Sequence, residues 1–296
     1  MNRAALYLIF CASAAIAACA GPSDLQKAAG AFSTATSVTA DVSLGYMNNL
    51  NKIERDGYLA RLRWNPSQVI SAQVLSTQTF ADKDLAVRYA AIGTLRAYAK
   101  VVSELTSTES AQLVADNAKQ LGAQLQDTSN KIRGLSAQTR ETKLMAEFFG
   151  QLAKLLIEHK QMTTLRELVS GSADRIDKIA AHLAIDVGGA AERELARFSG
   201  VRADAVRFYN DNRTAMSDEQ RRKALEEIRA NEERLDALQA RLHEITKLFD
   251  EFRQSHSSLN KALANGSSVA LAIERTERFL QRAMDLAKPI EALAAR

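Results

Sequence analysis

The sequence of 296 residues contains only two cysteines, Cys11 and Cys19, and both lie close to its amino terminus. All the residues after Cys19 therefore form a chain without a thiol. This lack excludes a disulfide-stabilised domain, a catalytic cysteine and the C-x-x-C-H site of a c-type haem from that part of the chain. Such a domain must be stabilised by its hydrophobic core, and 46% of the residues are hydrophobic.

Proline and glycine are also scarce, with three and 13 residues, and alternating strand patterns bounded by turn residues are missing. Apolar residues instead recur at spacings of three and four along most of the chain, which is the pattern of amphipathic helices. The sequence therefore predicts an all-α fold. We expect an elongated antiparallel bundle of about five or six long helices, with a coiled-coil-like C-terminal hairpin.

Capping and breaking residues predict where the helices begin and end. Ser23–Gln26 has the spacing of a capping box at the start of the first helix, and the proline of Trp64-Asn65-Pro66 predicts its end. Ser170-Gly171-Ser172 predicts a later helix end, because serine and glycine favour turns. Ser217–Gln220 predicts a second capping box at the start of a long charged helix.

The most regular helical pattern extends from Ile228 to Leu263. Its apolar residues alternate in steps of three and four over five heptads, as in a coiled-coil seam. Asn265-Gly266-Ser267 predicts a short turn, and Val269 begins a second stretch with the same alternation. A short turn makes consecutive helices antiparallel, so these two stretches predict the C-terminal hairpin.

Sequence motifs of common enzymes and cofactor sites are missing. The G-x-S-x-G, G-x-x-x-x-G-K-[ST], G-x-G-x-x-G and H-E-x-x-H motifs do not occur. None of the four histidines follows an acidic residue by three positions, so the usual di-iron motif of helical bundles is missing too. We expect a protein that is not an enzyme and has no cofactor or metal. Its net charge of +4 is small for this length, so we expect no nucleic-acid partner.

Two of the histidines, His159 and His256, lie on the apolar stripes of their predicted helices. One interpretation is a metal-binding or pH-sensing pair that meets between two helices. The simpler interpretation is a pair of polar positions that fix the register of the seam, as Asn231 also does. We therefore name both histidines as candidates for a polar pair in the seam.

The first 18 residues have the layout of a secretory signal peptide. Arg3 is the only charged residue before Asp24, and the residues of Ala4–Ala18 are all apolar or small. This run is shorter than the roughly 20 residues that a permanent membrane-spanning helix needs. We expect residues 1–18 to be removed, which leaves residues 19–296 as a single elongated helical-bundle domain.

The stretch Ile16-Ala17-Ala18-Cys19 resembles the lipobox of bacterial lipoproteins, in which a branched apolar residue and two small residues precede the cysteine. The resemblance implies that Cys19 is lipidated, with a diacylglycerol on its thiol and a further acyl chain, such as palmitate, on its amine. Two or three acyl chains anchor a protein stably to a membrane. Ala20 follows where an Asp would favour the inner membrane, so the resemblance implies the outer membrane, facing the periplasm.

Three classes of function agree with these patterns. We expect a lipid-anchored envelope protein that acts as a structural or protein-binding helical module, with a protein partner of unknown identity. A ligand-binding or sensory bundle is the first alternative, and a closed pocket between helices would favour it. The second is a membrane-active protein, because the apolar stretch Leu144–Leu156 is faintly similar to the inserting element of helical pore-forming toxins, although Glu147 and Lys154 interrupt it. Burial of that stretch in the bundle is the simpler interpretation.

Overall fold

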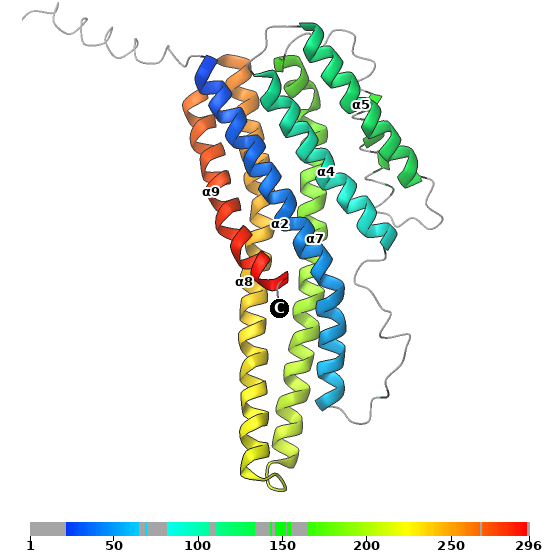
Figure 1. The fold of residues 1–296 in the computed structure, drawn as a ribbon, viewed down its shortest axis with the longest axis vertical. Coiled ribbons are helices and arrows are strands. Elements are labelled where there is room, and N and C mark those ends of the chain that lie inside the picture. Colours follow the sequence, from blue (N-terminus) through cyan, green and yellow to red (C-terminus); the bar gives the residue numbers. More distant parts are fainter. Residues whose placement is uncertain are drawn as a thin grey trace, which may run out of the picture.

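The computed structural model (Figure 1) is helical apart from short turns in the residues that it describes, and it has no strand there. This confirms the predicted all-α fold. The described residues are 22–64, 69, 82–106, 111–133, 143, 146–147, 149–151, 153–154, 165–266 and 268–294. The helices with defined bounds are α2 (Pro22–Trp64), α4 (Asp82–Leu105), α5 (Ala111–Arg133), α7 (Leu165–Asn212), α8 (Asp218–Asn265) and α9 (Val269–Ala294).

Most of the predicted helix ends are confirmed. Helix α2 ends at Trp64, two residues before the proline, and Ser217–Gln220 forms the expected capping box at the start of α8. Gly266 ends α8 with a φ of 65°, a left-handed conformation that glycine adopts without steric cost. The capping box expected at Ser23–Gln26 is wrong, because α2 already begins at Pro22 and Ser23 lies inside its first turn. Proline suits this position because the first helical N–H has no acceptor within the helix.

The helix end that we expected at Ser170-Gly171-Ser172 is wrong, because α7 continues through it from Leu165 to Asn212. The hydroxyls of Ser170 and Ser172 each donate to the carbonyl oxygen four residues earlier, at 2.7 Å, so both polar groups are satisfied within the helix. A glycine inside a helix costs about 1 kcal/mol relative to alanine. Burial of the neighbouring Leu168, Val169 and Ile176 exceeds that cost.

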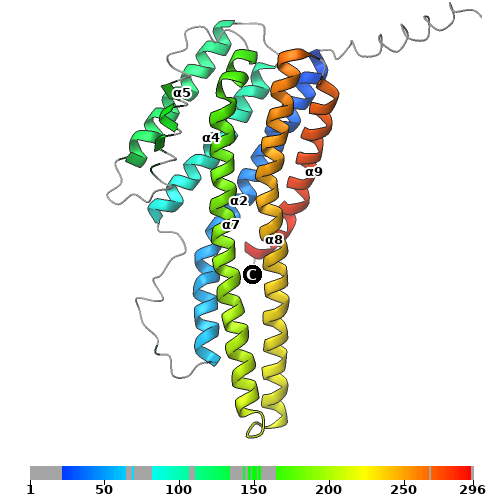
Figure 2. The same cartoon turned by 180° about the vertical axis from the view of Figure 1, so that it is seen from behind.

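The bundle has two parts along its long axis (Figures 1 and 2). In the part that we call the head, five helices surround the interior: all of α4 and α9, with residues 22–48 of α2, 165–190 of α7 and 245–265 of α8. Helix α5 packs against the outer side of α4. The part that we call the stalk contains only three: residues 49–64 of α2, 191–212 of α7 and 218–244 of α8. The turn between α7 and α8 forms the far end of the stalk, whereas α2 begins at the opposite end of the molecule.

The coiled-coil-like pairing predicted for the last two helices is only part of the arrangement. Helices α8 and α9 are adjacent and antiparallel, and the seam residues Ile245, Phe252 and Leu259 are buried as expected. However, α8 packs most extensively on α7, and α9 packs most extensively on α2. Both α2 and α9 begin at the same end of the molecule, so these two neighbours run parallel (Figure 1).

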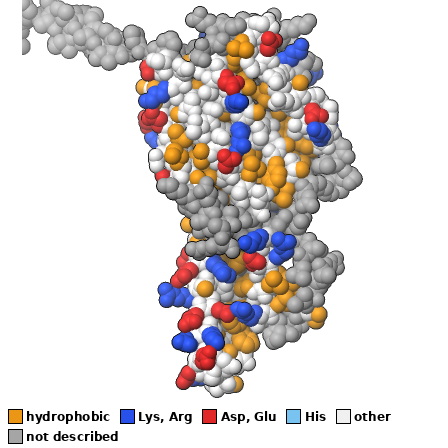
Figure 3. All heavy atoms as spheres, in the orientation of Figure 1, with side chains coloured by type: hydrophobic (Ala, Val, Ile, Leu, Met, Phe, Trp, Pro, Cys, Tyr) orange, Lys and Arg blue, Asp and Glu red, His pale blue; other side chains and the backbone are white. Residues whose placement is uncertain are grey.

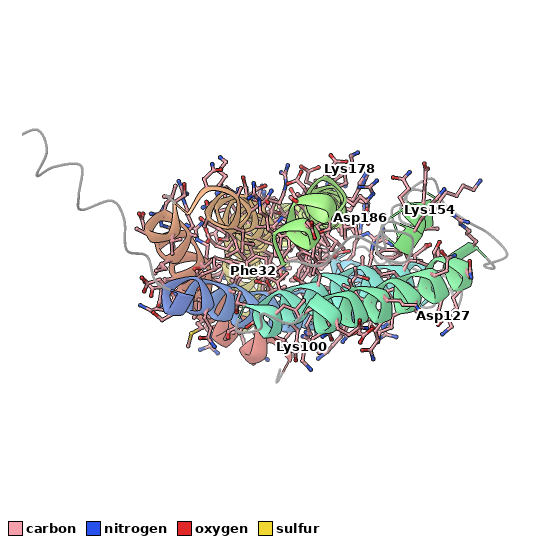
Figure 4. The ribbon with its side chains drawn as sticks, turned by 90° about the horizontal axis from the view of Figure 1, so that it is seen from above. Phe32, Lys100, Asp127, Lys154, Lys178 and Asp186 are labelled. Carbon is pink, nitrogen blue, oxygen red and sulfur yellow. The ribbon has the colours of Figure 1, made fainter. Side chains whose placement is uncertain are left out.

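The large core cluster fills the head and reaches Phe198 and Leu238 of the stalk, and the stalk also has a separate cluster of its own. Aromatic side chains fill the head, where the ring centroids of Phe32 and Phe252 are 5.1 Å apart and those of Phe252 and Phe279 are 6.2 Å apart. Seen from above, Phe32 lies between the helices while Lys100 and Lys178 lie at the periphery (Figure 4). In the stalk, a separate small cluster of buried residues consists of Trp64, Val201, Ala205 and Ala224.

The apolar stretch Leu144–Leu156 lies only partly within the described residues. Its described apolar residues Ala146, Phe149 and Ala153 are buried, and Glu147 and Lys154 are exposed. The Ser129 hydroxyl of α5 donates to the Ala146 carbonyl oxygen at 2.8 Å, so this stretch packs beside α5. The side chains of Leu144, Met145, Phe148, Leu152, Leu155 and Leu156 are outside the described residues. Among the described helices, none is long and apolar enough to cross a membrane.

Candidate functional site

Three polar side chains form a hydrogen-bonded group inside the head. Tyr98 Oη on α4 lies 2.8 Å from His256 Nε2 on α8, and the Ser172 hydroxyl on α7 lies 3.1 Å from the same tyrosine oxygen. Ser172 can donate either to Tyr98 or to the Leu168 carbonyl oxygen at 2.7 Å. All three side chains are buried, so polar contacts join three helices where water is excluded.

Aromatic rings surround His256. The ring centroids of Phe32 and Phe252 lie 5.9 Å and 6.1 Å from that of the imidazole in stacked arrangements, and Tyr98 approaches it edge-on at 5.3 Å. Burial lowers the pKa of His256 to about 4, against a smaller opposing effect of Asp177, and burial also raises the pKa of Tyr98. Both groups are therefore neutral at pH 7. The group fixes the register of three helices and carries no charge for acid–base chemistry at neutral pH.

A second polar cluster lies where the head meets the stalk. Arg88 Nη2 on α4 is 3.1 Å from Asp186 Oδ2 on α7, and both side chains are mostly buried. Further along α7, the side chain of Glu194 is only 1% exposed. Burial, together with the negative charge of Glu194, raises the pKa of Tyr46 on α2. Charged and polar groups thus join α2, α4 and α7 at the level where five-helix packing becomes three-helix packing.

A row of buried hydroxyls on α2 leads into this cluster. Thr39, Ser43 and Tyr46 are at most 4% exposed, and no hydrogen-bond partner for their side-chain oxygens is found within the described part of the chain. Thr36, by contrast, donates to the Phe32 carbonyl oxygen at 2.7 Å. Spacings of four and three place the three hydroxyls on one helix face. Buried polar atoms without partners are unfavourable, so a polar molecule would gain hydrogen bonds here.

The far end of the stalk has a different character, because charged side chains cover it. Six of the eleven residues in 213–223 are charged, and the lower part of the surface in Figure 3 is dense in basic and acidic side chains. Arg221 holds the α7–α8 turn together, since it donates to the carbonyl oxygens of Arg213 at 3.0 Å and Met216 at 3.1 Å and pairs with Asp218. The turn is therefore a fixed structure that presents charge to solvent.

Shallow grooves flank this end of the stalk on two faces. One is lined by residues of α8 around the half-exposed Leu225, together with Tyr209 of α7. The other is lined mainly by α7 around Val206, which is 39% exposed, with Glu232 of α8 at its edge. Each groove therefore combines one partly exposed apolar side chain with charged neighbours, a combination that protein interfaces also have.

The structure places one of the three site residues named from the sequence. His256 lies in the head interior, where its hydrogen-bond partner is Tyr98. Cys19 and His159 are outside the described residues, so the lipidation site and the histidine pair stay predictions. Of the other histidines, His243 is exposed and His182 is half-buried, and no group of three or more potential metal ligands occurs among the described residues.

Sequence reasoning missed the partners of His256 because nothing local identifies them. Tyr98 precedes the histidine by 158 positions, and its place on an apolar stripe indicated only that it would be buried. Ser172 was interpreted as part of a helix end, although a serine between buried residues is also the pattern of an internal hydrogen bond. Comparison with protein-family models, with curated proteins and with solved structures found no match for this chain.

Proposed function

We propose that this protein is a lipid-anchored bacterial envelope protein, without enzymatic activity, which holds a protein partner at a distance from the outer membrane. In this proposal Cys19 carries the lipid and the far end of the stalk binds the partner. The observation that carries the proposal is that α2 begins at one end of the long axis, while the α7–α8 turn lies at the opposite end (Figure 1).

The dimensions of the chain support this division. Helix α2 begins three residues after Cys19, and three residues span at most about 11 Å, so the start of α2 is tied closely to the proposed anchor. Helix α8 runs along the head and the stalk, and its 48 residues extend over about 72 Å. A partner bound at the α7–α8 turn would thus be held at nearly that distance from the lipid.

The surface at the far end of the stalk supports its assignment as the end that binds the partner. Leu225 is 49% exposed at the far end, among charged side chains that include Arg222 and Glu226. Paired opposite charges around an apolar centre favour a protein partner over a nucleic acid, which would require an excess of positive charge.

The lipid anchor is tested by Cys19→Ala in the full chain expressed in a diderm bacterium. We expect the wild-type protein to incorporate labelled palmitate and to fractionate with the outer membrane, and the variant to lose both properties. A variant that still fractionates with membranes at the mature size would contradict the anchor.

The binding end is tested by cross-linking in intact cells. A photo-reactive residue at Leu225 should give a discrete cross-linked product, whereas the same residue at Met284 should not. Met284 is a suitable control because it is also about half exposed but lies on α9 in the head. Equal products from both positions, or none from either, would contradict a partner at the end of the stalk.

The row of hydroxyls on α2 favours a second candidate function, a ligand-binding or sensory bundle. A small polar molecule between α2 and its neighbours would provide hydrogen bonds to Thr39, Ser43 and Tyr46. This candidate predicts that a library of small polar compounds contains one that raises the thermal midpoint of the protein, and that Ser43→Ala removes the effect of that compound.

A further inference from the structure

The two ends of α8 differ completely in charge. Its first turns, with the preceding α7–α8 turn, contain the charged residues Arg213, Asp218, Glu219, Arg221, Arg222 and Lys223. From Ala262 to Ile273, which includes the end of α8 and the start of α9, no residue is charged. Residues 28–40 of α2 form a similar uncharged run, but they are mostly buried. In the run from Ala262 to Ile273, by contrast, Asn265, Gly266, Ala270 and Leu271 are exposed.

The uncharged turn lies at the end where α2 begins. Lys27 Nζ on α2 is 3.1 Å from Glu277 Oε1 on α9, which places these two residues at about the same height. Leu271 precedes Glu277 by six residues, or about 9 Å, and Pro22 precedes Lys27 by five residues, or about 7.5 Å. Because the two helices run parallel, Leu271 lies at about the same height as Pro22, the first residue of α2. Pro22 follows Cys19 by only three positions.

Apolar side chains are exposed at this end of the molecule. Leu271, the third residue of α9, is 45% exposed, and Leu113, the third residue of α5, is 46% exposed. Helix α5 also begins at this end (Figures 1 and 2). The boundary between lipid headgroups and acyl chains is an environment that suits an exposed leucine beside an uncharged turn.

We propose that the α8–α9 turn, from Ala262 to Ile273, rests on the lipid surface, with Leu271 entering the boundary between headgroups and acyl chains. This inference rests on the proposed lipid anchor, since one short tether alone would leave the bundle free to tilt. With this second contact, the long axis of the bundle is held pointing away from the membrane surface. The contact also explains why charged residues are concentrated at the start of α8 and missing from its end.

The test uses the mature lipidated protein in vesicles of phosphatidylethanolamine and phosphatidylglycerol, with some of the lipid replaced by brominated phosphatidylcholine, which quenches tryptophan at close range. Leu271→Trp places a reporter in the turn. Its matched control is Leu225→Trp, since that leucine has a similar exposure of 49% but lies at the far end of the stalk. Trp64, the single tryptophan of the chain, lies in the stalk and serves as an internal reference.

Brominated lipid should reduce the emission added by Leu271→Trp about twofold, because a ring at this boundary sits about 5–10 Å inside the interface. The emission of Trp64 and the emission added by Leu225→Trp should not change. If both variants float with the vesicles but neither is quenched, or both are quenched equally, the contact proposed here is wrong while the anchor stands. If the protein does not float with the vesicles, both the anchor and the contact are wrong.

Discussion

Head and stalk are built partly from the same three helices, yet they bury different residues. The head encloses a cluster of aromatic rings that includes Phe32, Phe252 and Phe279, together with the neutral Tyr98–His256 hydrogen bond. The stalk encloses Trp64, which Phe208 approaches edge-on at 5.5 Å, together with small residues such as Ala205 and Ala224. Ion pairs fasten the stalk helices, with Arg61 Nε 2.7 Å from Asp204 Oδ2 and Arg63 Nη1 2.6 Å from Glu227 Oε1.

The number of helices explains this difference. Five helices surround a volume wide enough for large rings on every side, so most of the apolar burial occurs in the head. Three helices leave only a narrow interior, so most of their side chains lie close to the surface. There, charged side chains of neighbouring helices can form ion pairs. Because apolar burial contributes more than exposed ion pairs, the head should carry most of the stability and the stalk should open first.

The largest effect is expected for Phe252→Ala in the head, at about 3–5 kcal/mol, because the cavity left by a phenylalanine in a closed core does not collapse. The stalk counterpart is Val201→Ala, where two methyl groups are lost at about 0.8 kcal/mol each. Urea unfolding followed by circular dichroism measures both. Equal losses would mean that the two interiors contribute equally, and the comparison drawn above would be wrong.

Acid should weaken the head through His256. Its pKa is lowered from 6.5 to about 4, so the folded state keeps it neutral while the unfolded chain takes up a proton below pH 6.5. The stabilisation is complete above about pH 6.5 and is lost as the pH falls toward 4, and at pH 5 the loss is about 2 kcal/mol. Urea unfolding at pH 7.5 and pH 5 measures the difference.

Carboxylates elsewhere also titrate in this range, so the control is the same pair of measurements on His256→Gln. The glutamine amide can still bond to the tyrosine hydroxyl but has no proton to gain. We expect this variant to be less stable at pH 7.5 and to lose about 2 kcal/mol less than the wild type between the two pH values. An identical pH dependence in both proteins would show that His256 does not titrate between folded and unfolded states.

In the stalk, Asp204→Asn should cost about 1.5 kcal/mol, toward the low end for a hydrogen bond to a charged group, because Arg61 is half exposed to solvent. Amide hydrogen exchange should rise in the stalk residues of α2 and α7 and stay unchanged in the head. Glu233→Gln is the control, since its exposed ion pair with Arg229 lies within α8 of the stalk and joins no two helices. Faster exchange in the head as well would show that the two parts open together.

The regular seam was the most predictable part of the fold. Steps of three and four identify the buried face of α8, and Ile245, Phe252 and Leu259 are indeed buried. The same pattern could not tell which helix covers that face, because any apolar stripe satisfies it. Helix α9 therefore packs mainly on α2, almost 250 positions away along the chain, and not mainly on the helix that directly precedes it.

The candidate site was less predictable for the same reason. A histidine on an apolar stripe indicates a buried polar contact, and His256 makes one, but its partner depends on how distant helices align. The residues Ser170-Gly171-Ser172 predicted a helix end because serine and glycine favour turns. The prediction was wrong because a few residues of sequence do not show that their neighbours will be buried. The stretch Ile16-Ala17-Ala18-Cys19, which resembles a lipobox, is a local pattern that does not depend on the fold, so its test is biochemical.

The smallest effect is expected for the removal of a single buried hydroxyl. Here we compare Ser172, whose hydroxyl is hydrogen-bonded, with Ser43, which lies nearer the stalk. Ser172→Ala removes a hydroxyl that bonds within the buried group, and it should cost about 1 kcal/mol. Ser43→Ala removes an equally buried hydroxyl for which no partner is found within the described residues, so it should be neutral or slightly stabilising. Both substitutions remove one oxygen from a helix, so propensity changes cancel in the comparison. Thermal unfolding of the two variants beside the wild type measures the difference. A clear loss for Ser43→Ala would mean that its hydroxyl is already bonded in the folded protein without a ligand, which would contradict the ligand-binding candidate.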